Sequence, residues 1–337
     1  TSANVAATLN GIYGSGTYAY GSINGATTGS GTQGVVYNAS ALRLLDERAI
    51  GTASTSGGPR QTLRYTFQPK DGDAASVFYV YVSHLKSLDT SADAARRDTE
   101  ATVIRADADA LPAGSNILYV GDFNLYRSTE PAYQTFLGVG AGQAFDPLDR
   151  PGDWHSNSSF VDTFTQAPLT TAPSGFTGGG LDDRFDFQLV SNAVMTPGGF
   201  TYLAGTYRTF GNNGSVPRNG SINDTRSTAL PGLANRTQVL DLLTTVSDHL
   251  PVVADYSYAT VSTTTPAITV STSTLAQALS TTYGTPSTSA TFTVAGTGLT
   301  GSLTLSAPTG LELSTSSGSG YATTLTLSPS AGSVPAT

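Results

Sequence analysis

Polar side chains follow two short apolar runs of this chain, at the point where each run ends. The run 117–120 is followed by Asp122 and Asn124, and the run 77–82 is followed by His84. Such a run is typical of a buried strand that carries polar groups at its tip. Side chains two residues apart on an extended chain point to the same side, so one site could receive both Asp122 and Asn124. Taken alone, this segment also fits an ordinary turn, because Asp and Asn are common turn residues.

Two later segments add further carboxylates and a histidine. Asp186 lies inside the apolar alternation of residues 181–191, and Asp248 with His249 comes just before the strand-like segment 252–256. The chain therefore carries, in order, a His, an Asp with an Asn, an Asp, and an Asp with a His. Hydrolysis of a phosphodiester requires a nucleophilic water, stabilisation of charge on the nonbridging oxygens, and protonation or metal stabilisation of the leaving oxygen. These residue types can supply most of those requirements.

This ordered series resembles the endonuclease/exonuclease/phosphatase family, the metal-dependent fold shared by pancreatic-type DNases, abasic-site endonucleases and neutral sphingomyelinases. The resemblance covers roughly residues 34–257. It implies an α+β fold of the DNase I-like kind, a four-layer sandwich of two mainly antiparallel β-sheets flanked by helices. We expect this domain to occupy residues 1–258.

The resemblance also implies roles for the later residues. His249 would be the general acid–base at the phosphate, and Asp186 would be its orienting carboxylate. Asp248 would face the metal. A structural alternative for Asp186 is a buried ion pair with Arg184 that only orders the strand, and Asp183 could cap a turn.

The earlier residues receive roles in the same way. Asp122 would orient the attacking water or bind the cation, and Asn124 would hydrogen-bond a phosphate oxygen. His84 would act on the opposite side of the phosphate. Arg60 stands where related DNases place a phosphate-contacting arginine, although a solvated loop arginine is an equal alternative. His155 matches no motif of the family and receives no role.

The expected cofactor is a divalent cation. A hard, oxygen-rich site without thiolates favours Mg²⁺, with Mn²⁺ or Ca²⁺ as alternatives. The family pattern begins with a strand carrying a metal-site Asn and a second strand ending in a metal-binding Glu, and neither can be placed here. The first Glu of the chain, Glu47, falls after the segment where that strand belongs. We therefore expect the sequence to start just beyond the Glu strand, which leaves the activity of this chain open.

The elements that must position these side chains follow from the remaining pattern. Strands are expected at 34–38 and 41–47, as neighbours joined by two residues, and a further strand follows the turn at 58–60. Residues 91–111 and 131–137 predict helices that pack on the sheet, and a short helix is expected at 3–12. Long loops are expected over 139–180 and 205–236.

The character of the chain changes after Tyr258. From residue 261 to the end the only charged residue is Glu312, and Thr and Ser alternate with apolar residues in five short segments. That pattern predicts strands separated by turns. It resembles an immunoglobulin-like module of bacterial exported enzymes, and because such sandwiches have about seven strands, we expect residues 259–337 to form a partial one. A spacer or attachment role is expected for it.

Composition limits the class of protein. The 337 residues fit about two domains, and the absence of cysteine excludes disulfides and thiolate metal sites. Lysine occurs only at Lys70 and Lys86, whereas Thr, Ser and Gly are abundant, a mixture typical of a secreted or bacterial cell-surface protein. No apolar run is long enough to span a membrane. The chain begins with Thr1 rather than Met, which indicates processing or truncation.

The net charge of −8 argues against a protein that holds nucleic acid through a broad basic surface. A nuclease that releases its product can instead use a few arginines and a cation. The leading hypothesis is therefore an exported, metal-dependent phosphodiesterase, an extracellular nuclease acting on DNA or RNA. One alternative is a phosphatase or phospholipid phosphodiesterase on the same fold. Another is a catalytically inactive surface or matrix protein. The sequence leaves the substrate, the oligomeric state and the export route open.

Overall fold

Strands with alternating apolar residues build a six-stranded sheet at the centre of residues 1–260. In the computed structural model the strand order is β3-β4-β5-β6-β8-β7, and every neighbouring pair is antiparallel except β5 and β6. The structure describes residues 1–23, 33–52, 61–261, 265–330 and 332–337. The strands of this sheet are β3 (Leu42–Ile50), β4 (Thr62–Pro69), β5 (Phe78–His84), β6 (Asn116–Asp122), β7 (Ala144–Phe145) and β8 (Asp186–Ser191).

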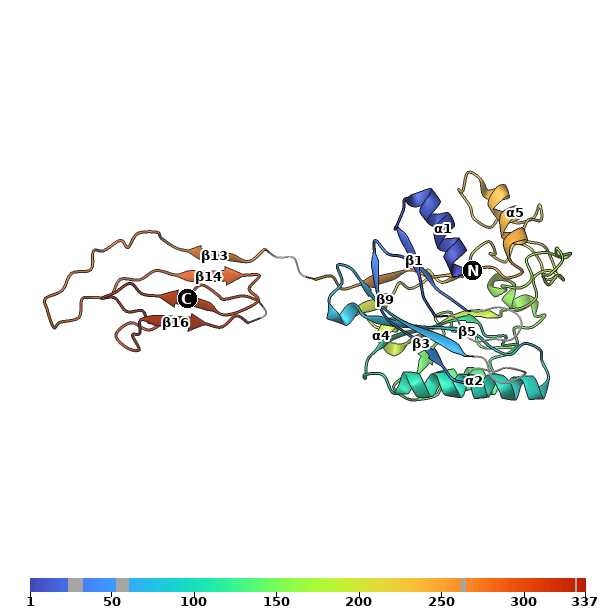
Figure 1. Ribbon diagram of the computed structural model, residues 1–337, viewed down its shortest axis with the longest axis horizontal. Coiled ribbons are helices and arrows are strands. Elements are labelled where there is room, and N and C mark those ends of the chain that lie inside the picture. Colours follow the sequence, from blue (N-terminus) through green and yellow to red (C-terminus); the bar gives the residue numbers. More distant parts are fainter. Residues whose placement is uncertain (24–32, 53–60, 262–264, 331) are drawn as a thin grey trace. The chain divides into compact units, whose positions relative to one another are not determined.

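One face of this sheet is covered by helices. The helix α2 (Ser91–Asp109) connects the parallel strands β5 and β6, as a parallel pair requires a crossover. Its side chains Ile104 and Ala108 pack with Tyr81 and Tyr119 of the sheet. Helix α3 (Pro131–Leu137) adds to the same core, and α2 lies along this face in Figure 1.

The opposite face packs on shorter strands. Leu118 and Val190 of the sheet share a second core with Phe200 and Tyr202 of β9 (Phe200–Tyr202). Three two-stranded ladders accompany the sheet, β1 with β2, β9 with β12, and β10 with β11. Their remaining members are β1 (Tyr18–Tyr20), β2 (Val36–Asn38), β10 (Arg208–Thr209), β11 (Val252–Val253) and β12 (Tyr256–Tyr258). Layers of helix, sheet and further strands confirm the α+β fold class expected from the sequence.

Further short helices complete the elements of this part. They are α1 (Ser2–Tyr13), α4 (Asn192–Met195), α5 (Arg236–Val246) and the 3₁₀ turns η1 (Ala74–Ser76) and η2 (Ser158–Thr163). The helices expected at 3–12, 91–111 and 131–137 are confirmed by α1, α2 and α3. No helix in the described ranges has the length and apolarity to cross a membrane.

One expectation about local structure is wrong. The segments 34–38 and 41–47 both contain strands, but they do not pair with each other: β2 pairs with β1, and β3 pairs with β4. The long loops expected over 139–180 and 205–236 are confirmed, since the first contains only β7 and η2 and the second only β10 and the first residue of α5. Ladder partners depend on the three-dimensional register, which a short connection does not determine.

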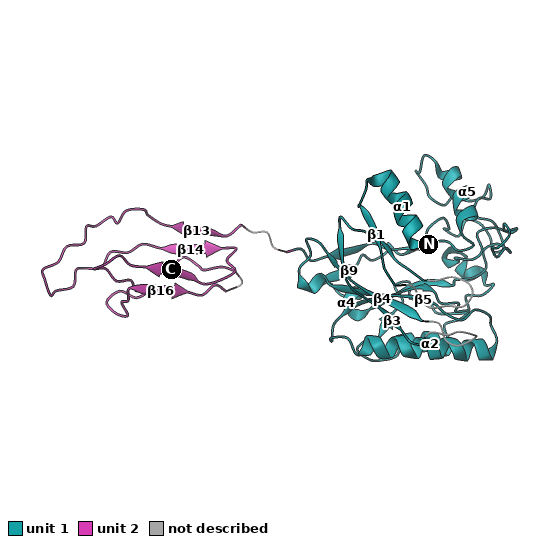
Figure 2. Ribbon diagram, viewed as in Figure 1, with its two compact units in different colours: residues 1–260 teal, residues 261–337 magenta. Residues whose placement is uncertain are grey.

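Residues 261–337 form a separate compact unit, coloured magenta in Figure 2. Its ladders join β13 (Ala267–Val270) to β14 (Val294–Thr297), and β15 (Leu303–Ser306) to β16 (Thr324–Leu327). Three of the five expected segments become strands. Of the segment 290–294 only Val294 lies in a strand, as the first residue of β14. The segment 311–314 forms only an isolated bridge, from Leu313 to Ala322.

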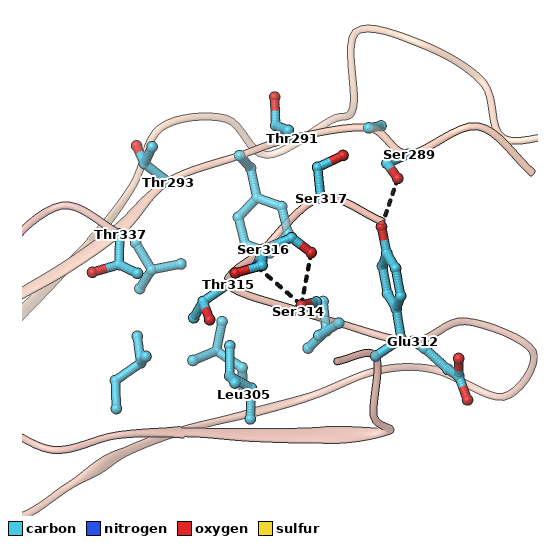
Figure 3. A pocket seen from close by; sticks show the side chains of 17 residues that line it. Ser289, Thr291, Thr293, Leu305, Glu312, Ser314, Thr315, Ser316, Ser317 and Thr337 are labelled. Atoms are coloured by element: carbon cyan, nitrogen blue, oxygen red, sulfur yellow. Dashed lines mark hydrogen bonds between the residues drawn. The ribbon is translucent and has the colours of Figure 1, made fainter. Parts of the chain in front are cut away.

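A pocket of about 300 Å³ opens between the strands of this second unit. Hydroxyl side chains such as Ser289, Thr291 and Ser314 surround it, as Figure 3 shows. The oxygens of Ser289 and Tyr321 lie 2.6 Å apart at its rim. Leu305, Leu313, Leu325 and Leu327 form its apolar floor.

Candidate active site

The register of the central sheet brings three of the predicted residues into one row. His84 at the end of β5 pairs with Asp122 at the end of β6, and Asp122 pairs with Asp186 at the start of β8. Because side chains alternate along a strand, these three lie on the same face as Leu118 and Val190. We call His84, Asp122 and Asp186 the site row. Parallel β5 and β6 end at the edge where antiparallel β8 begins, so the fold concentrates these groups at one edge.

Gly121 allows the two parallel strands to come together just before the site row. Its φ is +124°, and a Cβ added there would collide with the carbonyl oxygen of Ser83. Only glycine adopts this conformation and tolerates this approach without strain. The glycine that looks like a turn signal in the sequence therefore sets the spacing between His84 and Asp122.

Asp122 is held in place by three groups. It accepts hydrogen bonds from the backbone N–H of Asn124 at 2.9 Å and from its side-chain amide at 2.9 Å. His84 Nε2 lies 3.3 Å from Asp122 Oδ2. The Asn124 amide also donates to the carbonyl oxygen of Leu85 at 3.1 Å, so both of its side-chain hydrogens are used within the protein. In this geometry Asn124 orients Asp122.

His249 contacts the site row from the segment after α5. Its Nδ1 lies 2.6 Å from Asp186 Oδ2, a short charge-assisted contact. Burial lowers the pKa of His249, but the hydrogen bond and charge of Asp186, followed by the charges of Asp122 and Asp248, outweigh burial and raise the pKa to about 9. This raised pKa favours the protonated ring at neutral pH.

Gln166 is a neighbour of His249 for which the sequence gives no signal. Its side-chain Nε2 lies 2.7 Å from His249 Nε2. In this arrangement the amide donates to a neutral ring whose proton is on Nδ1. When the ring is protonated, the amide must turn over so that its oxygen accepts from Nε2–H. Gln166 comes from the long loop expected over 139–180, where no strand tip marks it.

A buried threonine ties this histidine to the sheet. Thr165 is fully buried, and its hydroxyl accepts hydrogen bonds from the backbone N–H groups of Phe185 and Asp186 at 3.1 and 3.2 Å. Its carbonyl oxygen accepts from the backbone N–H of Leu250 at 2.8 Å. The start of β8 and the residue after His249 are thus fixed to the same point, which keeps the ring at Asp186.

The remaining predicted residues are placed differently. The charge of Asp248 lies close enough to His249 to help raise its pKa. The Oδ2 of Asp248 also accepts a hydrogen bond from the backbone N–H of Thr177 at 2.8 Å. Arg60 lies outside the described residues.

Arg184 does not pair with Asp186. Its guanidinium binds Asp146 with two contacts of 2.8 and 2.9 Å, both partners being almost fully buried. It also lies over the rings of Phe187 and Tyr207. In this structure Asp186 therefore does not form the ion pair with Arg184 that the sequence allowed. Its carboxylate contacts His249 instead.

The carboxylates around His249 are of the type that hard cations such as Mg²⁺ prefer. Within the described ranges no group of three His, Asp or Glu side chains is spaced to hold a metal ion. Glu47 of β3 pairs with Tyr65 of β4, away from the site row, and accepts a hydrogen bond from the backbone N–H of Ser22 at 2.9 Å. The steps proposed for this site are carried by its histidines and carboxylates.

Comparison with known proteins gives similarity at the level of the chain fold. No protein-family model and no curated protein sequence matches this chain. Among solved structures, one similar protein is TDP2 of D. rerio in complex with a single-stranded DNA product, with 15% identity over 74% of this chain and 81% of that chain and a TM-score of 0.47.

Two further structures show similar values. The human Nocturnin catalytic domain with bound sulfate has 12% identity, covers 75% of this chain and 76% of that chain, and has a TM-score of 0.45. An endonuclease/exonuclease/phosphatase family protein from Bacteroides thetaiotaomicron has 15% identity, covers 75% and 79%, and has a TM-score of 0.44.

Proposed function

We propose that this chain is a phosphodiesterase, a nuclease that hydrolyses DNA or RNA with His249 as its general acid–base. The observation that supports this most directly is the 2.6 Å contact between His249 and Asp186 at the edge where Asp122 and His84 also lie. A histidine held by a carboxylate, with its second nitrogen directed toward further polar groups, is the arrangement that transfers protons to and from a reacting oxygen.

The charge state of His249 assigns it the acid step. With a pKa of about 9 the ring carries its proton at neutral pH. Once substrate replaces the Gln166 contact, Nε2–H can donate to a nonbridging oxygen and then to the leaving oxygen. The Nδ1 proton stays on His249 throughout. Asp186 accepts its hydrogen bond and stabilises the imidazolium. This sequence of steps needs no change in the position of the ring.

Asp122 has the complementary role of orienting the attacking water. Its carboxylate is positioned by Asn124 and by His84, and it lies in the same row as Asp186. A fixed carboxylate aligns the water and takes up its proton as the bond to phosphorus forms. The contacts expected between Asn124 or Arg60 and a phosphate oxygen stay predictions.

Mg²⁺, with Mn²⁺ or Ca²⁺ as alternatives, stays a prediction from the family resemblance, with Asp248 and Asp122 as its expected ligands. Secretion or display at a bacterial cell surface also belongs to this proposal, supported by the two lysines, the absence of cysteine and the Thr-rich residues 261–337. We assign residues 1–258 to the hydrolase domain and residues 259–337 to a partial immunoglobulin-like module with an attachment role.

Nicking of supercoiled plasmid tests the function. The wild-type chain is expected to nick plasmid in Mg²⁺, and His249→Ala is expected to lower the rate by at least ~10² because the proton donor is lost. A parallel reaction with EDTA tests the cation. Equal nicking by the two purified proteins would identify a contaminant and refute the assignment of His249.

A substrate panel tests the alternative on the same fold. Hydrolysis of sphingomyelin or inositol phosphates, together with no cleavage of DNA or RNA, would replace the nuclease proposal by that of a phospholipid phosphodiesterase or phosphatase. Absence of hydrolysis across the whole panel would favour the surface or matrix protein. The His249→Ala variant is the control for each substrate.

A further inference from the structure

His155 and Asp183 form a third histidine–carboxylate pair, outside the site row. His155 Nδ1 lies 2.7 Å from Asp183 Oδ1. The Asp183 side chain is 9% exposed, whereas the His155 side chain is 44% exposed. A buried carboxylate thus holds one ring nitrogen of a side chain that is itself partly open to solvent.

The backbone around His155 is anchored although the ring is exposed. The N–H groups of Trp154 and His155 both donate to the carbonyl oxygen of Tyr126, at 2.8 and 3.1 Å, and the N–H of Ser156 donates to the carbonyl oxygen of Asp182 at 2.7 Å. Trp154 itself is fully buried. An imidazole on such a segment has little freedom to lose when it binds a ligand, so the ring is preorganised.

This pair is connected to His249 through Gln166. The backbones of Gln166 and Asp183 exchange two hydrogen bonds, at 3.2 and 3.1 Å, and the Gln166 side chain contacts His249. A line of neighbouring rings also links the two imidazoles, with centroid separations of 5.4, 5.0 and 6.5 Å in the order His155, Tyr126, Phe185, His249. Gln166 and these two aromatic rings therefore connect the His155–Asp183 pair to His249.

We propose that His155, oriented by Asp183, binds the phosphate next to the one on which His249 acts. This inference rests on the proposed nuclease function, because a nucleic-acid strand offers a second phosphate beside the reacting one. Contacts from side chains to phosphates fix the register of a bound strand. Asp183 accepts a hydrogen bond from Nδ1–H and fixes the ring, and in the imidazolium form Nε2–H donates to the phosphate. His155 is then a substrate-binding residue, and Asp183 is a positioning residue.

The test compares a substrate with several phosphates and a substrate with one. The kcat and KM of the wild-type chain and of His155→Ala are measured on a single-stranded DNA oligonucleotide and on bis(p-nitrophenyl) phosphate. We expect the KM for the oligonucleotide to rise about 10-fold, which is typical for the loss of one charge-assisted hydrogen bond. Both constants for the single-phosphate diester are expected to stay unchanged.

Two further variants separate binding from folding. His155→Gln keeps a side-chain donor and is expected to recover part of the oligonucleotide KM. Asp183→Asn keeps the side-chain shape, and we expect it to raise the same KM by a smaller factor. If His155→Ala melts at a lower temperature than the wild type, His155→Gln provides the comparison.

The outcomes distinguish this inference from the function on which it rests. Unchanged constants on both substrates, or an equal loss on both, would overturn the role of His155 while leaving the phosphodiesterase function intact. A wild-type chain that hydrolyses neither substrate would refute the function and, with it, this binding role. A rise in KM confined to the oligonucleotide would support both.

Discussion

Replacing Asp186 by Asn removes the charge that most directly raises the pKa of His249. The rise from the ordinary value of 6.5 to about 9 favours the protonated ring by about 3 kcal/mol, at about 1.4 kcal/mol for each pKa unit. Asp122 and Asp248 also contribute, but burial opposes all three. Without Asp186 we therefore expect the pKa of His249 to fall to 6.5 or below.

This change can be measured directly, because the chain contains only three histidines. The imidazole resonances are followed by NMR between pH 5 and pH 10 and assigned with His249→Ala. Hydrolysis should fall on the alkaline side as the general acid loses its proton, near pH 9 in the wild type and near pH 6.5 or lower in Asp186→Asn. Asp248→Asn is the matched control, since it removes a more weakly acting charge and should shift the pKa less.

Two results would refute this reasoning. A wild-type His249 that titrates near 6.5 would show that Asp186 does not outweigh burial. A pKa that is unchanged in Asp186→Asn would show that the short contact contributes nothing to the protonation of the ring.

The raised pKa of His249 also predicts how the free energy of unfolding depends on pH. Because this pKa is higher in the folded chain than in the unfolded chain, the stabilisation by His249 is fully present below pH 6.5 and is lost as the pH rises through about 9. In urea unfolding, the free energy of unfolding of the wild type should fall between pH 6.5 and pH 9.5, and it should fall less in His249→Ala. An equal fall in both proteins would contradict the raised pKa of His249. Gly121→Ala should destabilise the fold by at least about 1–3 kcal/mol, since φ is +124° and the new Cβ meets the carbonyl oxygen of Ser83; a neutral result in urea unfolding would disprove that close approach. Asp146→Ala should cost about 3–5 kcal/mol by leaving Arg184 buried without its partner, and a thermal melt like that of the wild type would show that water reaches the guanidinium.

The sequence was informative where local pattern determines geometry. Apolar runs that end in His84 and in Asp122 predict strand tips, and both side chains lie at the ends of β5 and β6. The helix over 91–111 is predicted by the spacing of its apolar residues and by its N-terminal capping residue Thr90. The Thr90 hydroxyl accepts a hydrogen bond from the backbone N–H of Asp93. These features depend on neighbours in the chain.

Other features depend on contacts that the local sequence does not encode. Gln166 reaches His249 from a segment without regular periodicity, and 83 positions separate the two residues. Arg184 binds Asp146 rather than the nearby Asp186, and its guanidinium is buried among the aromatic rings of Trp154 and Phe187. His155 lacks a motif and is identified only by the buried carboxylate beside it.

The single parallel pair in the central sheet has a consequence for how this protein assembles. Because β5 and β6 are parallel, His84 and Asp122 meet only after α2 has crossed the sheet, and His249 joins Asp186 across 63 further positions. Contacts of such high sequence separation are made late and slow the folding of a domain. Hydrolytic activity during refolding should therefore recover no earlier than native tertiary packing, which makes turnover a reporter of complete folding rather than of secondary structure.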